Sequence, residues 1–332
     1  MTKLALSLAC TQTDRAAPIL DARVRISGCD VIPLPGVTQT IFRQVLEDQA
    51  FDIAEMSMSS HLIQVDRGVR EYVALPVFLS RSFRHSAIYI NTKSGIKKPE
   101  DLRGCRFGVQ QFQQTVGLWV RGILTDEYGV RSQDVTWMNG GLEAPGGGER
   151  LKLDLPEEIS LSPIPATETL NGMLTDGRLD ALIATKPPSS FTNGDSRVAR
   201  LFPDYPSAEK DYFRKTGAFP IMHCVVVRQS LVDQHPWLPA EIFNAFVRAK
   251  ALALDDMKQV NILRLTLPWI AETAAEVQSL MGGNIWNYGF KESRHEIEHM
   301  LRYAHGDGLT GRHLTPEEVF DPSTFSLLDK VQ

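Results

Sequence analysis

Three cationic or cation-capable side chains stand close together between two apolar stretches of the sequence. Arg81, Arg84 and His85 fall within five positions, between the strand-like runs VALPVF and SAIYIN. A plain connection between two strands does not require this concentration of positive charge, and an exposed turn is the alternative. The planar guanidinium group of arginine binds a carboxylate through two parallel hydrogen bonds. The cluster therefore predicts a site for a small anion.

Polar and basic side chains also follow other predicted strands, in loops where acidic residues are few. Because imidazole titrates near neutral pH, a histidine in such a loop can supply a proton in catalysis. A buried structural histidine is the alternative in each case. The candidate proton donors are His61, His85 and His223. The candidate substrate-binding residues are Arg15, Ser59, Ser60, Arg81, Arg84, Gln111, Thr115 and Lys186. His295 and His299 have an i,i+4 spacing that could hold a metal, but no third ligand lies near them, and we expect no metal.

The elements that must position these residues alternate between strand-like and helical patterns. Strand-like runs cover residues 4–10, 51–57 and 72–78, and helical apolar spacing covers residues 40–48 and 114–130. Helical patterns dominate the last third of the chain. This alternation predicts an α/β fold, in which helices pack on layers of sheet.

Two strand-like connections, near residues 78–91 and 220–229, bracket a self-contained α/β segment. We therefore expect a first lobe formed by residues 1–84 and 222–332, with residues 85–221 inserted as a second lobe. Each lobe should hold a mixed sheet flanked by helices, with two hinge crossovers between the lobes. Open α/β sheets bind ligands beyond the carboxyl ends of their strands. The candidate residues should accordingly meet in a cleft between the lobes.

The composition excludes several classes of partner. The 332 residues are 43% hydrophobic and 23% charged, and the formal net charge is −5, with basic residues dispersed along the chain. Such a sequence is typical of a globular protein that binds neither nucleic acid nor a membrane. Four cysteines without a CxxC pair predict free thiols. The first ten residues resemble a short export signal, but a first strand explains them, and we expect a cytoplasmic protein.

Several longer motifs together resemble the 4,5-dihydroxyphthalate decarboxylase family. They include EMSMSSH, PVFLSRSFRHSAIYIN, QQTVGLWVRGIL, FPIMH and NIWNYGF, and the resemblance runs from Lys3 to about Phe325. It implies the fold of type 2 periplasmic binding proteins, a cytoplasmic homo-oligomer (a dimer or higher) and an activity without a cofactor. Where family loops read Pro-Glu-Tyr and Asp-Phe-Trp-Pro-Tyr, this chain has Gln110–Phe112 and Asn284–Tyr288.

The resemblance implies conversion of 4,5-dihydroxyphthalate to protocatechuate and carbon dioxide, in which a proton replaces a carboxylate on a ring carbon. The ring hydroxyls supply electron density, one of the candidate histidines supplies the proton, and the arginines hold carboxylates. The differences in the two loops leave a related aromatic dicarboxylate open as the substrate. A non-catalytic solute-binding protein for a small aromatic or carboxylate anion is the alternative function, because it would share the fold and an anion-binding cleft.

Overall fold

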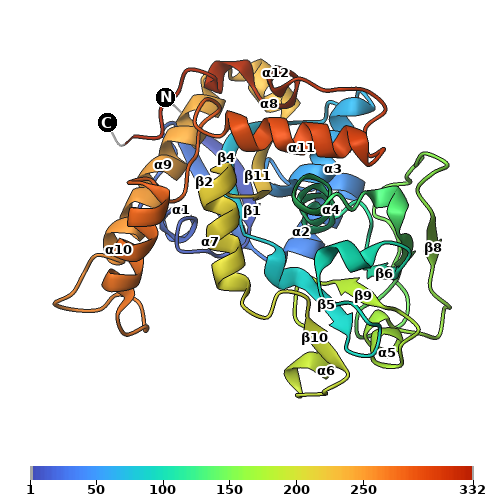
Figure 1. Cartoon of the computed structure of the whole chain (residues 1–332). Helices are drawn as coiled ribbons and strands as arrows, with labels where there is room; N and C mark the ends of the chain where they lie inside the picture. The colour runs from blue at the N-terminus through green and yellow to red at the C-terminus, as the bar shows by residue number, and fades with distance from the viewer. Residues whose placement is uncertain (1–2, 331–332) are drawn as a thin grey trace. The chain divides into compact units, whose positions relative to one another are not determined.

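The structure, a computed structural model, describes residues 3–330 and divides the chain into two compact units (Figure 1). Unit 1 is formed by the chain up to Arg81, by Ile221–Ile297 and by the chain from Thr315 onward. Unit 2 is formed by Ser82–Pro220 and Glu298–Leu314. Each unit holds a mixed sheet with helices, so the predicted α/β fold is confirmed. None of the described helices is both long and apolar enough to cross a lipid bilayer.

The five-stranded sheet of unit 1 has the order β2-β1-β3-β11-β4. β1 is parallel to β2 and β3, whereas β11 is antiparallel to β3 and β4. The carboxyl ends of β1, β3 and β4 therefore lie at the same edge as the amino end of β11. The strands are β1 (Leu4–Cys10), β2 (Cys29–Pro35), β3 (Ile53–Ser57), β4 (Tyr72–Arg81) and β11 (Ile221–Arg228). The helices are α1 (Ala17–Leu20), α2 (Thr38–Arg43), α3 (Met58–Asp66), α8 (Gln229–Gln234), α9 (Leu238–Asp256), α10 (Ile270–Met281) and α12 (Pro316–Val319).

The six-stranded sheet of unit 2 has the order β10-β5-β9-β6-β7-β8. β9, β6, β7 and β8 are parallel to one another, whereas β5 is antiparallel to β9 and β10. The strands are β5 (Ile88–Asn91), β6 (Arg106–Val109), β7 (Thr136–Asn139), β8 (Leu161–Pro163), β9 (Ala181–Ile183) and β10 (Val198–Arg200). The helices are α4 (Thr115–Tyr128), α5 (Leu170–Thr175), α6 (Ser189–Thr192) and α7 (Tyr205–Thr216).

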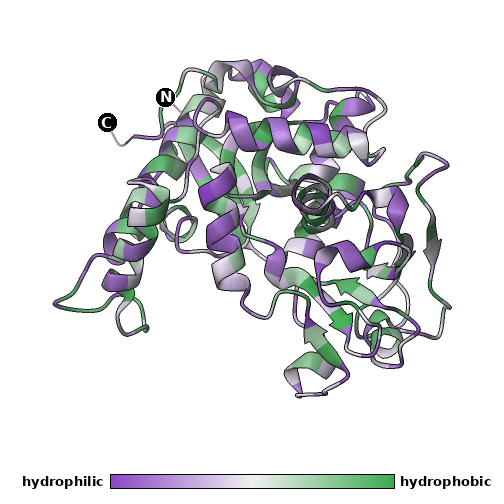
Figure 2. Ribbon diagram, viewed as in Figure 1, coloured by the Kyte–Doolittle hydropathy of each residue, from purple (hydrophilic) through white to green (hydrophobic). Residues whose placement is uncertain are grey.

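The central strands of both sheets are apolar because helices cover them. Figure 2 shows these strands as largely hydrophobic, whereas α7 and α11 (Arg294–Gly306) carry many hydrophilic residues. Ile53 and Val226 in unit 1 and Phe107 in unit 2 are completely buried. α4 ends at Gly129, whose φ of 65° lies in the left-handed region that favours glycine at the end of a helix.

Residues 298–314 belong to unit 2 because they pack against α4. The Nε of Arg121 donates to the Asp307 carboxylate at 2.6 Å, and this ion pair is buried. The Tyr303 ring lies against Gly122, where an added Cβ would come within 2.3 Å of the ring. Glycine is required at this close approach.

The division into units differs from the predicted one, which kept residues 222–332 together. The chain passes between the units at 81/82 and 220/221, near the two expected crossovers, and again at 297/298 and 314/315. The apolar spacing of α11 indicates that one of its faces is buried. It does not indicate that the covering surface, α4, lies nearly two hundred residues earlier in the chain.

The buried ion pair predicts a large effect of one substitution in unit 2. Asp307→Asn would leave the Arg121 guanidinium buried without its counter-charge, and we expect the free energy of unfolding to fall by about 3–5 kcal/mol. Urea denaturation followed by circular dichroism measures this. The control is Asp211→Asn, which removes an exposed ion pair with Arg214 and should cause no measurable change. Equal effects of the two substitutions would contradict the role of the buried pair.

Candidate active site

Two residues suited to proton transfer lie side by side in the sheet of unit 1. Glu55 on β3 is opposite Val225 on β11, so His223, two residues along β11, lies on the same face as Glu55. The His223 Nδ1 and the Glu55 Oε1 are 2.6 Å apart. The Glu55 side chain is 2% exposed and the His223 side chain is 20% exposed. The pair thus joins a buried carboxylate to a partly accessible imidazole.

Hydrogen bonds hold the Glu55 carboxylate as an anion. Its Oε2 accepts a bond from the backbone N–H of Thr11 at 2.7 Å. Burial by itself raises the pKa of Glu55, but the hydrogen bonds from His223 and Thr11, with the charge of His223, outweigh burial and leave the pKa below its ordinary value. Burial and the Glu55 charge raise the pKa of the Cys10 thiol to about 12. This thiol is therefore protonated and not a nucleophile.

The second ring nitrogen of His223 is available to a ligand, because within residues 3–330 the His223 Nε2 has no hydrogen-bond partner. Phe42, on α2, packs edge-on against the imidazole with ring centroids 4.8 Å apart. The register of β11 against β4 shifts on both sides of His223, and such irregularities redirect a side chain. With Nδ1 on a carboxylate, Nε2 can exchange a proton with a bound molecule.

Arg15 brings a positive charge to the same edge, from the loop after β1. Its Nε donates to the Leu79 carbonyl at 2.9 Å, and its NH1 donates to the Asp14 carboxylate at 2.8 Å. The guanidinium lies over the Trp286 ring, 3.9 Å from the centroid, in a cation–π contact. The Arg15 side chain is 15% exposed, so part of its charge remains accessible.

The segment that carries Trp286 is fixed by residues near the end of the chain. Asp329 accepts a hydrogen bond from Asn284 Nδ2 at 2.6 Å and forms a buried ion pair with Lys250 of α9. Lys250 also donates to the Trp286 carbonyl at 2.7 Å. These contacts place the ring on which Arg15 rests.

Arg81, the first residue of the predicted anion cluster, binds groups of its own chain in unit 1. Its NH1 donates to Glu296 at 3.0 Å, and its NH2 donates to the Ser293 hydroxyl at 2.7 Å and to the Asn287 carbonyl at 3.0 Å. The Arg81 side chain is only 1% exposed. These bonds tie the end of β4 to the segment between residues 287 and 296.

The predicted residues of α3 lie in the interior of unit 1. Ser59 and Ser60 are completely buried. The His61 Nε2 donates to the Val319 carbonyl at 2.9 Å, and burial lowers the pKa of His61 to about 4, so its imidazole is neutral. His61 lines a cavity of about 140 Å³, smaller than the roughly 300–1,000 Å³ of typical ligand pockets.

The other predicted residues belong to unit 2. Two of them, Arg84 and His85, stand at the start of its first helical turn. His85 is 2% exposed between the rings of Phe202 and Tyr212, and burial lowers its pKa to about 4. Burial also lowers the pKa of Arg84 to about 10, an effect that the Glu209 charge opposes. The His85 side chain is thus enclosed within unit 2, whereas Arg84 is half-buried.

The loop after β6 carries two more predicted residues, Gln111 and Thr115. Gln111 Nε2 donates to the Gly148 carbonyl at 2.7 Å, and Thr115 is buried at the start of α4. Glu149 accepts hydrogen bonds from the backbone N–H groups of Phe112 at 2.6 Å and Gln113 at 3.2 Å. A carboxylate of the chain itself thus occupies these donors. Lys186 is exposed.

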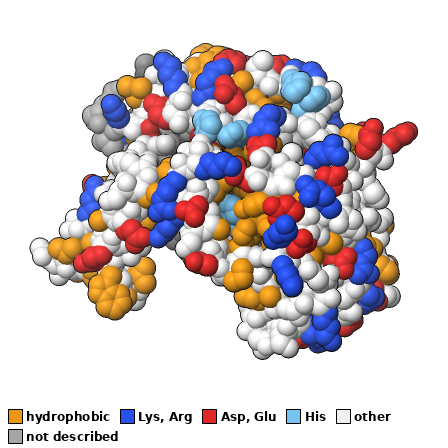
Figure 3. All heavy atoms as spheres, viewed as in Figure 1, with side chains coloured by type: hydrophobic (Ala, Val, Ile, Leu, Met, Phe, Trp, Pro, Cys, Tyr) orange, Lys and Arg blue, Asp and Glu red, His pale blue; other side chains and the backbone are white. Residues whose placement is uncertain are grey.

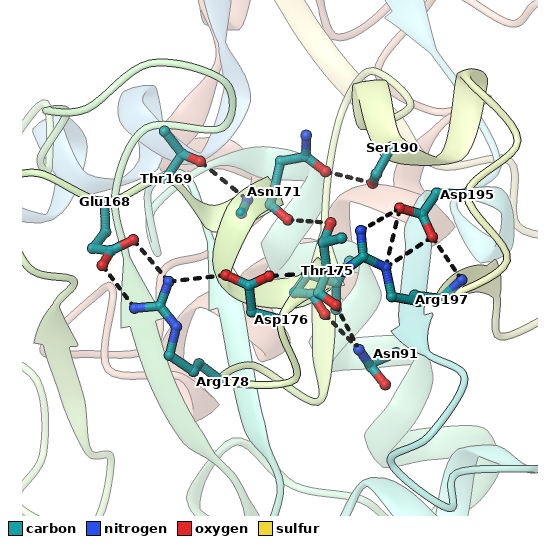
Figure 4. A network of polar contacts seen from close by, with 12 residues as sticks. Asn91, Glu168, Thr169, Asn171, Thr175, Asp176, Arg178, Ser190, Asp195 and Arg197 are labelled. Carbon is teal, nitrogen blue, oxygen red and sulfur yellow. Dashed lines mark hydrogen bonds and ion pairs between the residues drawn. The ribbon is translucent and has the colours of Figure 1, made fainter.

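A cavity of about 550 Å³ in unit 2 lies near the amino ends of β6 and β9, whereas Gln111 and Thr115 follow the carboxyl end of β6. Two arginines that line it form ion pairs: Arg106 binds Asp180 at 2.8 Å and Arg197 binds Asp195 at 2.7 Å. Figure 4 shows the adjoining polar network, which includes Asn91 of β5, whose side chain donates to the Leu174 carbonyl of α5 at 2.7 Å.

Sequence reasoning missed Glu55, Trp286 and Glu149. A carboxylate in the middle of the strand-like run IAEM was a signal for Glu55, since an acid that faces a sheet interior requires a partner. Nothing in the spacing pointed to Trp286 or Glu149, because their contacts come from distant parts of the chain. Of the predicted residues, the structure places His223 and Arg15 with accessible polar atoms at the edge of the unit 1 sheet.

No family model matches the chain. The 4,5-dihydroxyphthalate decarboxylase of Comamonas testosteroni is 39% identical over 324 residues, which cover 98% of this chain and 98% of the relative. The 4,5-dihydroxyphthalate decarboxylase of Pseudomonas putida is 41% identical over 214 residues, which cover 64% of this chain and 83% of the relative.

Solved structures share the fold at low identity. The periplasmic aliphatic sulphonate binding protein SsuA of Escherichia coli matches with a TM-score of 0.55 and 12% identity, covering 97% of this chain and 99% of that protein. The sulfonate-binding protein SsuA of Methylobacillus flagellatus matches with a TM-score of 0.50 and 14% identity, covering 97% and 92%. The expected fold of periplasmic binding proteins is thus confirmed. Sequence identity over nearly its whole length shows that the chain belongs to the 4,5-dihydroxyphthalate decarboxylase family.

Proposed function

We propose that the chain decarboxylates 4,5-dihydroxyphthalate, or a close hydroxylated aromatic dicarboxylate, with His223 as the proton donor. The product from 4,5-dihydroxyphthalate is protocatechuate, with carbon dioxide. Two relatives bear the name of this activity. The observation that carries the proposal is the pair of His223 and the buried Glu55, which leaves the Nε2 of a partly accessible imidazole without a hydrogen-bond partner within residues 3–330.

The proposed reaction balances without a further reactant. Electron density from a ring hydroxyl, para to the departing carboxylate, flows to the ring carbon, and a C–H bond forms there with the proton from His223 Nε2. The bond between this carbon and the carboxylate then breaks, its electron pair restores the aromatic ring, and carbon dioxide leaves. Each turnover consumes one proton, which solvent returns to His223. Glu55 orients the imidazole through its contact with the His223 Nδ1.

The three candidate histidines differ in their surroundings, and these favour His223. Burial lowers the pKa of both His61 and His85 to about 4. Near neutral pH these two imidazoles hold no acidic proton to donate. His223 instead lies beside the Glu55 carboxylate, and its side chain is 20% exposed.

Arg15 is the arginine of unit 1 that we propose as a carboxylate ligand, because its side chain is 15% exposed and that of Arg81 is 1% exposed. The structure gives the Arg81 charge a partner within the protein. Roles in substrate binding stay predictions for Ser59, Ser60, Arg81, Arg84, Gln111, Thr115 and Lys186.

We also propose a cytoplasmic, homo-oligomeric protein. Its four cysteines are free thiols, which supports a reducing compartment. A non-catalytic binding protein for a small aromatic or carboxylate anion is the second candidate function. The fold shared with the SsuA proteins favours it.

Incubation with the proposed substrate separates these two functions. We expect the chelator-treated protein to convert 4,5-dihydroxyphthalate into equimolar protocatechuate and carbon dioxide, measured by chromatography and gas analysis. Phthalate, which lacks the electron-donating hydroxyls, should remain intact. Binding of 4,5-dihydroxyphthalate without turnover, also after divalent metal is restored, would instead support the binding protein.

Substitutions in the pair should act on the chemical step. His223→Gln should lower kcat by about 10²-fold or more with little change in the free energy of unfolding. The matched control is His235→Gln, which alters a histidine of the same unit on a helix end outside the site. Glu55→Gln removes the carboxylate that orients the imidazole and should also lower kcat. An unchanged kcat in both variants would exclude this assignment.

His61 should make the protein sensitive to acid. Its pKa is about 4 in the folded protein and 6.5 ordinarily, so the unfolded chain binds the extra proton as the pH falls below 6.5. The stability that the neutral ring contributes is complete above pH 6.5 and decreases toward pH 4, by about 2 kcal/mol between pH 6.5 and pH 5. His61→Gln retains a donor for the Val319 carbonyl and should lose less stability over this range. Urea denaturation at both pH values measures the difference, and parallel losses in the two proteins would refute it.

A further inference from the structure

An exposed apolar surface lies on the C-terminal part of unit 1. Residues 260–281, which we call the arm, comprise a loop and α10 (Figure 1). The loop exposes several large apolar side chains, among them Ile262 at 74% and Trp269 at 75%. The whole set is Val260, Ile262, Leu263, Leu267 and Trp269. Figure 3 shows hydrophobic side chains gathered at the lower left, where Figure 1 places the arm. Contiguous apolar surfaces of this kind mark interaction sites.

The helix of the arm has an apolar face that its own chain leaves incompletely covered. No residue of α10 is buried. Among its half-buried residues, Ile270, Ala274, Val277 and Met281 recur at intervals of four, three and four. This spacing is that of the seam between two paired helices. The small side chain of Ala274 in this seam allows a second helix to approach.

Trp269, just before α10, is held in a conformation that requires an explanation. Its φ of 59° lies in the left-handed region, which is unfavourable for a bulky side chain. Its ring is also three-quarters exposed. Strain of this kind persists where the position has a function.

The charges of the arm favour a second copy of the chain as its partner. Arg264 lies in the loop, whereas Glu272 and Glu276 lie in the first two turns of α10. In a two-fold interface, a contact of one residue with a different residue of the partner is matched by the reverse contact. An antiparallel arrangement would therefore place each Arg264 near the partner's carboxylates. The arm holds one cation and two carboxylates, a net charge of −1, which disfavours an anionic membrane as the partner.

We propose that the arm is the surface through which two copies of this chain associate, with α10 packed against α10 of the second copy across a two-fold axis. The exposed side chains of the loop then pack on the same helix pair. The proposal concerns assembly and stands apart from the proposed decarboxylation.

Analytical ultracentrifugation of the full chain from 1 to 100 μM tests this interface. We expect a dimer or a higher even assembly, and the substitutions Ile262→Asp and Trp269→Ala, made together, should raise the dimer Kd at least tenfold. The matched control is Ile32→Asp, another exposed apolar residue of unit 1 outside the arm. It should associate as the unaltered protein does. Circular dichroism verifies that each variant is folded.

An exchange of charges distinguishes the loss of a specific contact from a general disruption of the fold. Arg264→Glu alone should weaken association, and adding Glu272→Arg in the same chain should restore it, because each contact is made twice in a two-fold interface. A monomeric unaltered protein, an arm variant that still associates, or an absence of rescue would overturn the proposal. Binding of the unaltered monomer to phosphatidylglycerol vesicles, lost on substitution of the arm, would also overturn it.

Discussion

The burial of one carboxylate sets the geometry of the candidate site. Glu55 lies inside the sheet of unit 1, where an ionised group needs hydrogen bonds from the protein to compensate for lost water. Thr11 supplies one bond from the end of β1, and His223 supplies another from β11. The registers of three neighbouring strands therefore meet at this carboxylate. A shift of one residue in β11 would turn His223 to the other face and leave Glu55 without its partner.

The same constraint gives the imidazole its orientation. The His223 Nδ1 binds the Glu55 carboxylate, so the Nε2 on the other side of the ring points away from Glu55. Within residues 3–330 this Nε2 has no hydrogen-bond partner and is available to a bound molecule. Arg15 adds a cation at the same edge, held between the Leu79 carbonyl and the Trp286 ring. A binding protein of this fold needs a cation and hydrogen-bond donors for an anion. A decarboxylase needs in addition a group that delivers a proton, and we propose that the buried carboxylate makes His223 such a group.

The sequence predicted the features that depend on local patterns. Alternating apolar periods indicated the α/β fold, and strand ends rich in cations indicated His223 and Arg15 as candidates. The surroundings of these residues depend on distant segments and could not be read in the same way. Arg81 had the appearance of a carboxylate ligand, but Glu296, more than two hundred residues away, supplies its partner. Glu55 lies within a strand, and the pattern of cationic residues at strand ends therefore did not indicate it. Residues 298–314 join unit 2 through Arg121 and Tyr303, contacts that no spacing reveals.

The central claim is that His223 delivers the proton to the ring, and a structure of the complex tests it most directly. Crystals of the His223→Gln variant with 4,5-dihydroxyphthalate would hold the substrate in place before reaction. The account predicts that the carboxylate-bearing ring carbon lies within roughly 3–3.5 Å of the position of the His223 Nε2, with a carboxylate near Arg15. A substrate ring bound away from residue 223, with another acidic group against that carbon, would contradict it.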